Sequence, residues 1–220
     1  MKQISISQLF DLHQTIAADL FLTCEYPWQV LPRISDFIRA MIPLLPEDFV
    51  EIAPEVMAAR SAKIAPTAGL TGPLIIGRHA EIRHCAFVRG SAIIGDEAVV
   101  GNSTELKNVI LFNKVQVPHF NYVGDSILGF KAHMGAGSIT SNVKSDRTLI
   151  EIHYGDQVLP TGLKKIGAMI GDFVEIGCNS VLNPGSIIGR ETIIYPLSMV
   201  RGFVPPRSIY KRQGEIAGKY

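Results

Sequence analysis

The sequence has few cysteines and almost no excess charge of either sign. Its 220 residues include three cysteines, Cys24, Cys85 and Cys178, which are far apart, odd in number and not arranged as Cys-x-x-Cys. This excludes a disulfide framework and a cysteine-paired metal site, and it indicates a reducing, cytoplasmic compartment. The formal net charge of +1 predicts no nucleic-acid partner, because a polyanion requires a strongly basic surface.

Long apolar runs are lacking as well. No stretch reaches the roughly 20 consecutive apolar residues of a membrane-spanning helix. The N-terminus has one early lysine, then polar residues and Asp11 where a signal peptide would be apolar. We therefore expect neither a membrane partner nor a secretory signal. The mean hydropathy of +0.22 then indicates a large core rather than a bilayer span.

The chain does contain a six-residue repeat of aliphatic residues, which fits neither an amphipathic helix nor a hairpin sheet. Such a repeat is typical of a mainly β fold, the parallel β-helix. Three repeats form one triangular coil, so residues eighteen apart become neighbours at about 4.8 Å. The first run is Ile64, Leu70, Ile76, Ile82, Val88, Ile94, Val100 and Leu106, and the second is Ile170, Ile176, Leu182, Ile188, Ile194 and Val200.

The repeat divides the chain into three parts. Residues 1–60 show apolar residues at helical spacing after a capping-box pattern at Ser5 to Gln8, and we expect two short helices that cap one end of the stack. A partner-docking arm is the alternative. The β-helix is predicted for residues 61–204, with an excursion at 141–165 that contains a small hairpin. Residues 205–220 form a C-terminal tail, expected to be solvated.

The repeat slips after Leu106, and this irregular region is the first candidate for a functional site. It resumes four residues later in a register that places Gln116 and Tyr122 at inward positions. Both are poor core residues, and polar residues that break a regular pattern indicate function or strain.

Arg89 and Lys107 are eighteen residues apart, so the repeat places them on one face in successive coils. Two like charges at roughly 5 Å repel each other unless an anion bridges them or they turn into water. A phosphate or diphosphate is the natural bridge, and a pair of solvated surface charges is the alternative.

His119 is the candidate general base. A neutral imidazole held by a carboxylate such as Glu105 is poised near neutral pH. A single histidine in a coil is more often structural, but His119 belongs to a cluster with Tyr122, His133 and Asn142 that adjoins both the slip and the excursion.

Three segments in this region carry a resemblance to a known family. They are Gly101-Asn-Ser-Thr-Glu105-Leu-Lys107, Pro118-His119-Phe-Asn-Tyr122-Val-Gly124-Asp125 and Gly135-Ala-Gly-Ser-Ile-Thr-Ser-Asn142. Together they resemble the acetyltransferase domain of GlmU and, more closely, the C-terminal domain of archaeal sugar-1-phosphate nucleotidylyltransferases. The resemblance covers about residues 62–204.

The resemblance implies a left-handed β-helix and a homotrimer with active sites at the subunit interfaces. It also implies a CoA-dependent N-acetyltransferase that acts on an amino-sugar phosphate, in UDP-N-acetylglucosamine biosynthesis, with acetyl-CoA as acyl donor and no required metal. The family's nucleotidyl-transfer domain is expected to be absent, because residues 1–60 are too short for it and no glycine-rich nucleotide signature occurs.

The resemblance also implies a role for individual residues. His119 would be the general base, Glu105 would orient it, and the Ala136 amide would stabilise the oxyanion. The remaining assignments are Arg89, Lys107 and Tyr122 for the sugar phosphate, Asn142 for the amine and acetyl group, His133 in place of a substrate-binding asparagine, Lys144 and Arg147 as competing matches for a family lysine, and Cys178, Pro196 and Arg201 for CoA.

Two alternatives from other classes stay open. A lone domain of this type could be a non-catalytic module that binds a sugar phosphate or a nucleotide sugar. Less favoured is a zinc enzyme like the γ-class carbonic anhydrases, because His79 and His84 have suitable spacing but the third ligand would fall near Pro43.

Overall fold

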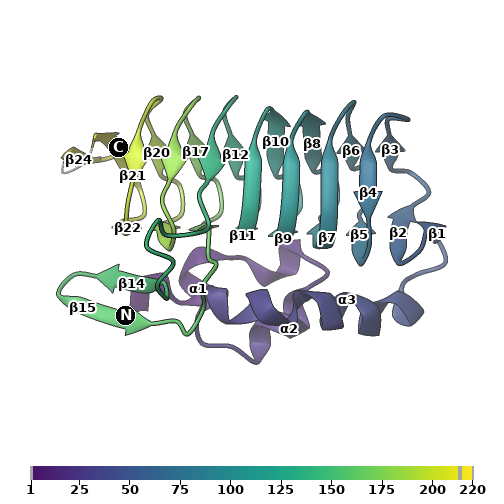
Figure 1. Cartoon of the computed structure of the whole chain (residues 1–220), viewed down its shortest axis with the longest axis horizontal. Helices are drawn as coiled ribbons and strands as arrows, with labels where there is room; N and C mark the ends of the chain where they lie inside the picture. Colours follow the sequence, from purple (N-terminus) through teal and green to yellow (C-terminus); the bar gives the residue numbers. More distant parts are fainter. Residues whose placement is uncertain (1, 213–214, 220) are drawn as a thin grey trace.

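The computed structural model describes residues 2–212 and 215–219 and confirms the predicted parallel β-helix. Short strands stack in successive coils along one axis, with helices beside them (Figure 1). No helix in the described part of the chain is long and apolar enough to cross a membrane.

The coils have three faces, named here faces I, II and III. Face I contains β3 (Lys63–Ile64), β6 (Glu81–Ile82), β8 (Val99–Asn102), β10 (Gln116–His119), β12 (His133–Met134), β17 (Glu175–Ile176), β20 (Ile193–Ile194) and β23 (Ser208–Arg212). Face II contains β4 (Gly69–Thr71), the first parts of β7 (Phe87–Ile94), β9 (Glu105–Leu111) and β11 (Tyr122–Leu128), and then β13 (Ile139–Thr140), β18 (Val181–Leu182) and β21 (Met199–Val200). Face III contains β2 (Val56–Ala59), β5 (Leu74–Ile76), the second parts of β7, β9 and β11, and then β16 (Ala168–Ile170), β19 (Ser186–Ile188) and β22 (Phe203–Val204).

The register after Leu106 differs from the predicted one. Leu106 pairs with Val123, which is fully buried, and Tyr122 is the preceding, outward residue. In the same way Val117 pairs with Val100 and is fully buried, whereas Gln116 is exposed. The prediction that Gln116 and Tyr122 take inward positions is therefore wrong, because each adjoins a valine that fills the core.

The corner between faces II and III explains the slip. In β7 the chain turns there through two residues with positive φ, Gly90 and Ser91. In β9 and β11 a single residue makes the turn, Asn108 with φ of 55° and Asp125 with φ of 47°. Asparagine and aspartate tolerate this left-handed conformation better than most residues. A coil with this shorter corner has one residue fewer, so residues paired in successive coils are seventeen rather than eighteen apart, as in Lys107 and Gly124. The six-residue repeat therefore shifts by one position.

The N-terminal segment covers face III, and this corrects the prediction of a cap over one end. Strands of face III are buried on both sides, as in Leu74, Ile75 and Ile76, so their outward aliphatic residues require a cover. The helices run along the row of coils (Figure 1), with α3 against β7 and β9 and η3 against β11. They are η1 (Lys2–Ile4), α1 (Ile6–Leu9), η2 (Leu12–Gln14), α2 (Ala18–Leu22), η3 (Pro27–Arg33), α3 (Ile34–Met41) and η4 (Ile42–Leu44).

Both ends of the stack carry an antiparallel strand rather than a helix. β1 (Phe49–Ala53) pairs with β2 within the region predicted to be helical. β23 and β24 (Glu215–Gly218) form the last pair. The C-terminal segment is thus not simply solvated, because β23 pairs with β20 and buries Tyr210.

An antiparallel hairpin occurs within residues 141–165, the range in which the excursion was predicted. β14 (Glu151–Tyr154) and β15 (Gln157–Pro160) form an antiparallel pair that lies outside the stack (Figure 1). Ile152 in β14 and Ile150 just before it are buried. The Tyr154 ring lies against Phe203, and its hydroxyl donates to Gln3 in the N-terminal segment at 3.1 Å.

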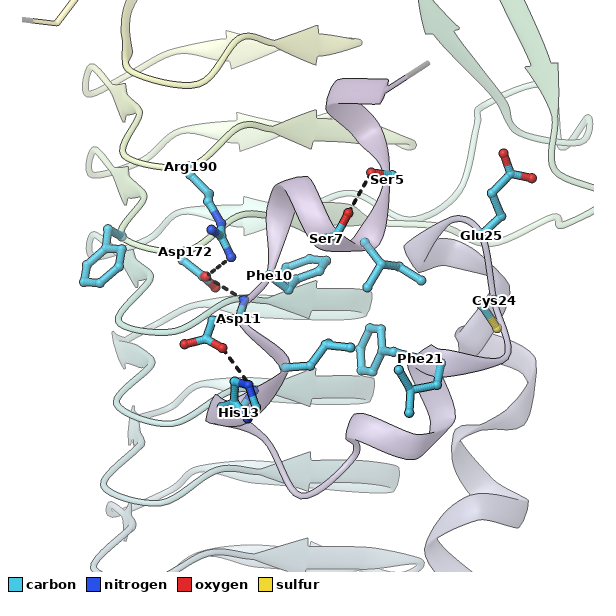
Figure 2. Close-up of a pocket in the computed structure, with 14 residues that line it drawn as sticks. Ser5, Ser7, Phe10, Asp11, His13, Phe21, Cys24, Glu25, Asp172 and Arg190 are labelled. Atoms are coloured by element: carbon cyan, nitrogen blue, oxygen red, sulfur yellow. Dashed lines mark hydrogen bonds and ion pairs between the residues drawn. The ribbon is translucent and has the colours of Figure 1, made fainter.

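A buried carboxylate joins the N-terminal segment to the stack. Asp172 accepts a backbone hydrogen bond from Asp11 at 2.8 Å and forms a 2.8 Å ion pair with Arg190 (Figure 2). It also accepts one from the Phe130 N–H at 2.8 Å. Burial raises the pKa of Asp172 despite the opposing effect of Arg190. The adjoining hollow of about 590 Å³ lies between this segment and the coils, with Phe10 and Phe21 in its wall.

Candidate functional site

Face II presents two outward rows of side chains, one before and one after each inward residue. Arg89, Lys107 and Gly124 occupy the second row in register on β7, β9 and β11. Glu105 and Tyr122 occupy the first row, also in register. The parallel pairing thus brings four of the predicted site residues onto one patch of face II.

Each cation of this patch already has its own carboxylate. Arg89 Nε donates to Glu105 Oε1 at 2.7 Å, and Lys107 Nζ lies 3.0 Å from Asp125 Oδ1. The hydrogen bond that Arg89 donates to Glu105 raises the pKa of Arg89, which stays charged. The expected repulsion between Arg89 and Lys107 is therefore relieved within the chain. This corrects the view that an anion or solvent must separate them.

Asp125 is the centre of a hydrogen-bond network that sequence reasoning missed. Its carboxylate accepts from Lys107, from Asn108 Nδ2 at 2.9 Å and from Asn142 Nδ2 at 2.6 Å. Only 5 % of the Asp125 side chain is exposed. The available signal was the corner itself, since a residue with positive φ at a shortened turn favours Asp, Asn or Gly.

Tyr122 lies over Gly124 and contacts the same network. Asn142 Nδ2 donates to the Tyr122 hydroxyl at 3.3 Å. A Cβ atom on Gly124 would lie 2.6 Å from that hydroxyl, so the absence of a side chain makes room for the ring. Burial raises the pKa of Tyr122, which keeps its hydroxyl protonated at neutral pH. The hydroxyl can therefore donate to a ligand.

His119 lies at the corner between faces I and II, three residues before Tyr122. Its backbone N–H donates to the buried Asn121 Oδ1 at 3.1 Å, which fixes the corner. The imidazole is exposed, and within residues 2–212 and 215–219 it makes no hydrogen bond. The predicted contact with Glu105 is thus not formed in this conformation, because Glu105 binds Arg89 instead.

The same corner carries three further predicted residues in successive coils. Gly137 N–H donates to His119 O at 3.0 Å, Asn179 N–H to Ala136 O at 2.8 Å, and Leu197 N–H to Cys178 O at 2.9 Å. His119, Ala136, Cys178 and Pro196 therefore form one row along the stack. The Ala136 N–H has no acceptor within the described residues.

His133 lies away from this patch. It points outward from face I, beside the inward Met134, and its Nδ1 is 2.8 Å from Glu175 Oε2. A single chain thus does not bring His133 to Arg89 and Lys107, and sequence clustering overstated its proximity. The two faces diverge at the corner that holds His119.

The excursion forms a second hollow beside face II. This cavity of about 620 Å³ is bounded by Lys144, Glu151 and Arg201, among others. Lys144 Nζ donates to Thr148 Oγ1 at 2.6 Å and lies 3.7 Å from Asp146 Oδ2. Arg201, by contrast, forms no ion pair within the described part of the chain. Arg147 is exposed at the turn of the excursion.

Of the two histidines considered for a zinc site, His84 has a hydroxyl neighbour. His84 Nδ1 is 2.9 Å from Thr67 Oγ1 at the same corner as His119 but in an earlier coil. No group of three or more His, Cys, Asp or Glu side chains in residues 2–212 and 215–219 is placed to hold a metal ion.

Sequence comparison confirms the resemblance stated above, although no family model matches the chain. The chain is 29% identical over 194 residues to the bifunctional protein GlmU of Methanococcus maripaludis (strain C5), covering 87% of this chain and 47% of that protein. It is 30% identical over 194 residues to the bifunctional protein GlmU of Methanococcus vannielii, covering 86% and 46%. The chain spans about half the length of these curated relatives.

Comparison of structures supports the fold. The crystal structure of the polySia specific acetyltransferase NeuO matches with a TM-score of 0.51 and 12% sequence identity, covering 72% of this chain and 80% of that one. At this identity the match shows a shared β-helix architecture and no more.

Proposed function

We propose that this chain is a CoA-dependent N-acetyltransferase that acts on an amino-sugar phosphate. The observation that carries the proposal is the convergence of Arg89, Lys107, Tyr122 and Asn142 on one patch of face II, next to the corner that presents the His119 imidazole. The similarity to GlmU proteins supports the same reaction class.

In the proposed reaction His119 acts as the general base. The amine nitrogen of the sugar attacks the carbonyl carbon of the thioester, and His119 accepts a proton from that nitrogen. The C–S bond then breaks, and the CoA thiolate takes up the proton from His119. The exposed, unbound imidazole is free to approach a substrate, and no covalent enzyme intermediate is needed once the two reactants are aligned.

The developing oxyanion requires a hydrogen-bond donor near His119. The N–H of Ala136 suits this role, because it follows His119 in the same row and has no acceptor within residues 2–212 and 215–219. Removing one such donor typically costs about 10²–10³-fold in kcat.

The sugar phosphate would bind to Arg89 and Lys107, with the Tyr122 hydroxyl as a further donor. A phosphate at Arg89 competes with Glu105 for the guanidinium, since the two now share a 2.7 Å hydrogen bond. Glu105 would then be released toward His119, the orienting role that the resemblance implies. Binding of the acceptor would thus complete the catalytic pair.

Acetyl-CoA would lie along the later coils, past Cys178 and Pro196, with its phosphates near Arg201. Arg201 suits an anion because it has no ion pair within the described residues, whereas Arg207 and Arg212 face Glu191 and Glu215. Lys144 and Arg147 in the excursion are proposed to lie near the substrates. No metal takes part in this scheme.

We also propose a homotrimer in the cytoplasm, with each site completed at a subunit interface. His133, on face I, would then serve the site of a neighbouring protomer. Light scattering tests this assembly, since a trimer has three times the 24.0 kDa mass of the chain.

A thiol-release assay tests the proposed function. Purified protein is mixed with acetyl-CoA and a panel of amino-sugar phosphates that starts with glucosamine 1-phosphate, and free CoA is measured. Acceptor-dependent release of CoA is expected. Binding of a panel member by calorimetry without CoA release would identify a binding module instead.

A further inference from the structure

We propose that Asp125 is a positioning residue for the acceptor, an inference that rests on the proposed function. Asp125 has no role in the assignments above. Its contacts join three parts of the site from three coils: Lys107 and Asn108 from β9, Asp125 itself in β11, and Asn142 after β13.

The corner conformation holds the Asp125 carboxylate in place. The residue has φ of 47° and is 3 % exposed, and its backbone carbonyl accepts from Gly167 N–H at 2.8 Å, where the chain returns from the excursion. A carboxylate fixed at both its backbone and its side chain is a rigid reference for the groups around it.

A carboxylate accepts hydrogen bonds and offers none, so Asp125 determines how the Asn142 amide lies. The Nδ2 group must point toward Asp125, at 2.6 Å, and toward the Tyr122 hydroxyl. The Oδ1 atom is left without a partner in the described part of the chain. Asn142 therefore presents a hydrogen-bond acceptor to the site, the group that an amine N–H of the acceptor sugar would bind.

Asp125 also fixes the cation next to Arg89. Lys107 Nζ lies 3.0 and 3.1 Å from the two carboxylate oxygens, although a lysine side chain is otherwise flexible. One carboxylate thus sets both the ammonium for the phosphate and the amide oxygen for the amine. Asp125 therefore acts on the binding of the acceptor rather than on the chemical step.

Asp125→Asn tests this proposal with almost no change in volume. An amide in place of the carboxylate brings a donor that conflicts with Lys107 and Asn142. We expect kcat/KM for the acceptor to fall by about 10²-fold, the usual effect of misplacing a substrate by about 1 Å. The KM for the acceptor should rise, and the KM for acetyl-CoA should not change.

Asp172→Asn is the matched control. Asp172 is also a buried carboxylate at a β-helix corner that accepts from a cation and two N–H groups, but it faces the N-terminal segment (Figure 2). It should lower the melting temperature and leave the acceptor KM unchanged. A rise in acceptor KM shared by both variants, or absent in Asp125→Asn, would overturn the positioning role.

A crystal structure of Asp125→Asn separates this inference from the proposed function. If the wild type releases no CoA with any acceptor, the proposed function fails, yet the variant still reports on positioning. We expect Lys107 Nζ to leave its present place and the Asn142 amide to rotate. Unchanged Lys107 and Asn142 side chains in the variant would refute the inference.

Discussion

Arg89 and Glu105 form an ion pair across neighbouring coils, with Nε 2.7 Å from Oε1. Arg89 is in register with Lys107, so Glu105 reaches Arg89 diagonally from the row beside it. The pair raises the pKa of Arg89, so the guanidinium remains charged throughout the neutral range. Any anion that binds Arg89 must therefore compete with Glu105, which links occupancy of the patch to the freedom of this carboxylate.

Glu105→Gln should consequently lower both the KM for the acceptor and kcat. The neutral amide competes less with a phosphate for Arg89, so KM should fall about 3–10-fold, equivalent to about 1 kcal/mol. The variant cannot orient His119 as a carboxylate does, so kcat should fall about tenfold or more. Steady-state kinetics with glucosamine 1-phosphate measure both values. The control is Glu81→Gln, which breaks the ion pair between Glu81 and Arg83. Equal changes of KM and kcat in this control would contradict competition between Glu105 and the phosphate for Arg89.

His119→Ala should lower kcat by about 10²-fold or more, the usual contribution of a general base. The exposed imidazole makes no hydrogen bond within residues 2–212 and 215–219, so the melting temperature should stay close to that of the wild type. CoA release and differential scanning fluorimetry provide the two measurements. His84→Ala removes an exposed histidine from the same corner two coils earlier and should retain full activity. Near-normal turnover of His119→Ala would argue against the proposed base.

The repeat predicts the coils well but not the register of the coils that form the site. Hydrophobic periodicity finds inward positions, and it fails where a corner loses a residue at Asn108 or Asp125. The position of the N-terminal helices is a second feature that the repeat does not predict. Their amphipathic pattern is visible in the sequence. That they cover a side of the stack rather than an end depends on the outward aliphatic residues of face III, such as Ile93.

The site shows the same limit. In-register stacking brings Arg89 and Lys107 together as expected, because the eighteen-residue spacing precedes the slip. The carboxylate partners of both cations depend on side-chain conformations, which hydrophobic periodicity does not reveal. His133 is close in sequence to the other residues of the cluster, but it lies on face I, whereas Arg89 and Lys107 lie on face II. Successive strands of a triangular coil belong to different faces, so closeness in sequence does not place two residues on one face.

Val117→Ala and Gln116→Ala test the corrected register. Val117 is fully buried opposite Val100, so its truncation should lower the free energy of unfolding by about 2 kcal/mol or more. Gln116 is exposed, and its truncation should change this free energy by about 0.5 kcal/mol or less. Urea denaturation compares the two variants. The reverse order of effects would restore the register in which Gln116 points inward.

Tyr122→Phe should remove one tyrosine that ionises at unusually high pH. Burial raises the pKa of Tyr122 above its usual value of about 10. The pKa of Tyr122 is higher in the folded protein than in the unfolded chain, so folding favours the protonated hydroxyl. The resulting stability is fully present below the pKa of the unfolded chain, and it is lost as the pH rises through the pKa of the folded protein. The stability difference between wild type and variant should therefore shrink above about pH 10. Absorbance titration at alkaline pH and urea denaturation at neutral and alkaline pH measure both effects; a constant difference would contradict the assignment.

Gly124→Ala should separate activity from stability. The added Cβ would lie 2.6 Å from the Tyr122 hydroxyl, 2.9 Å from Tyr122 Cε1 and 2.8 Å from Asn142 Nδ2, all atoms of side chains rather than of the backbone. Both can move aside, so the free energy of unfolding should fall by only about 1 kcal/mol. Their displacement should nevertheless lower kcat/KM for the acceptor by about tenfold or more. Gly218→Ala is the control, since nothing lies within 4 Å of its added Cβ. If Gly124→Ala keeps full activity, Tyr122 and Asn142 do not contact the acceptor, because displacement of these side chains would otherwise raise the KM for the acceptor.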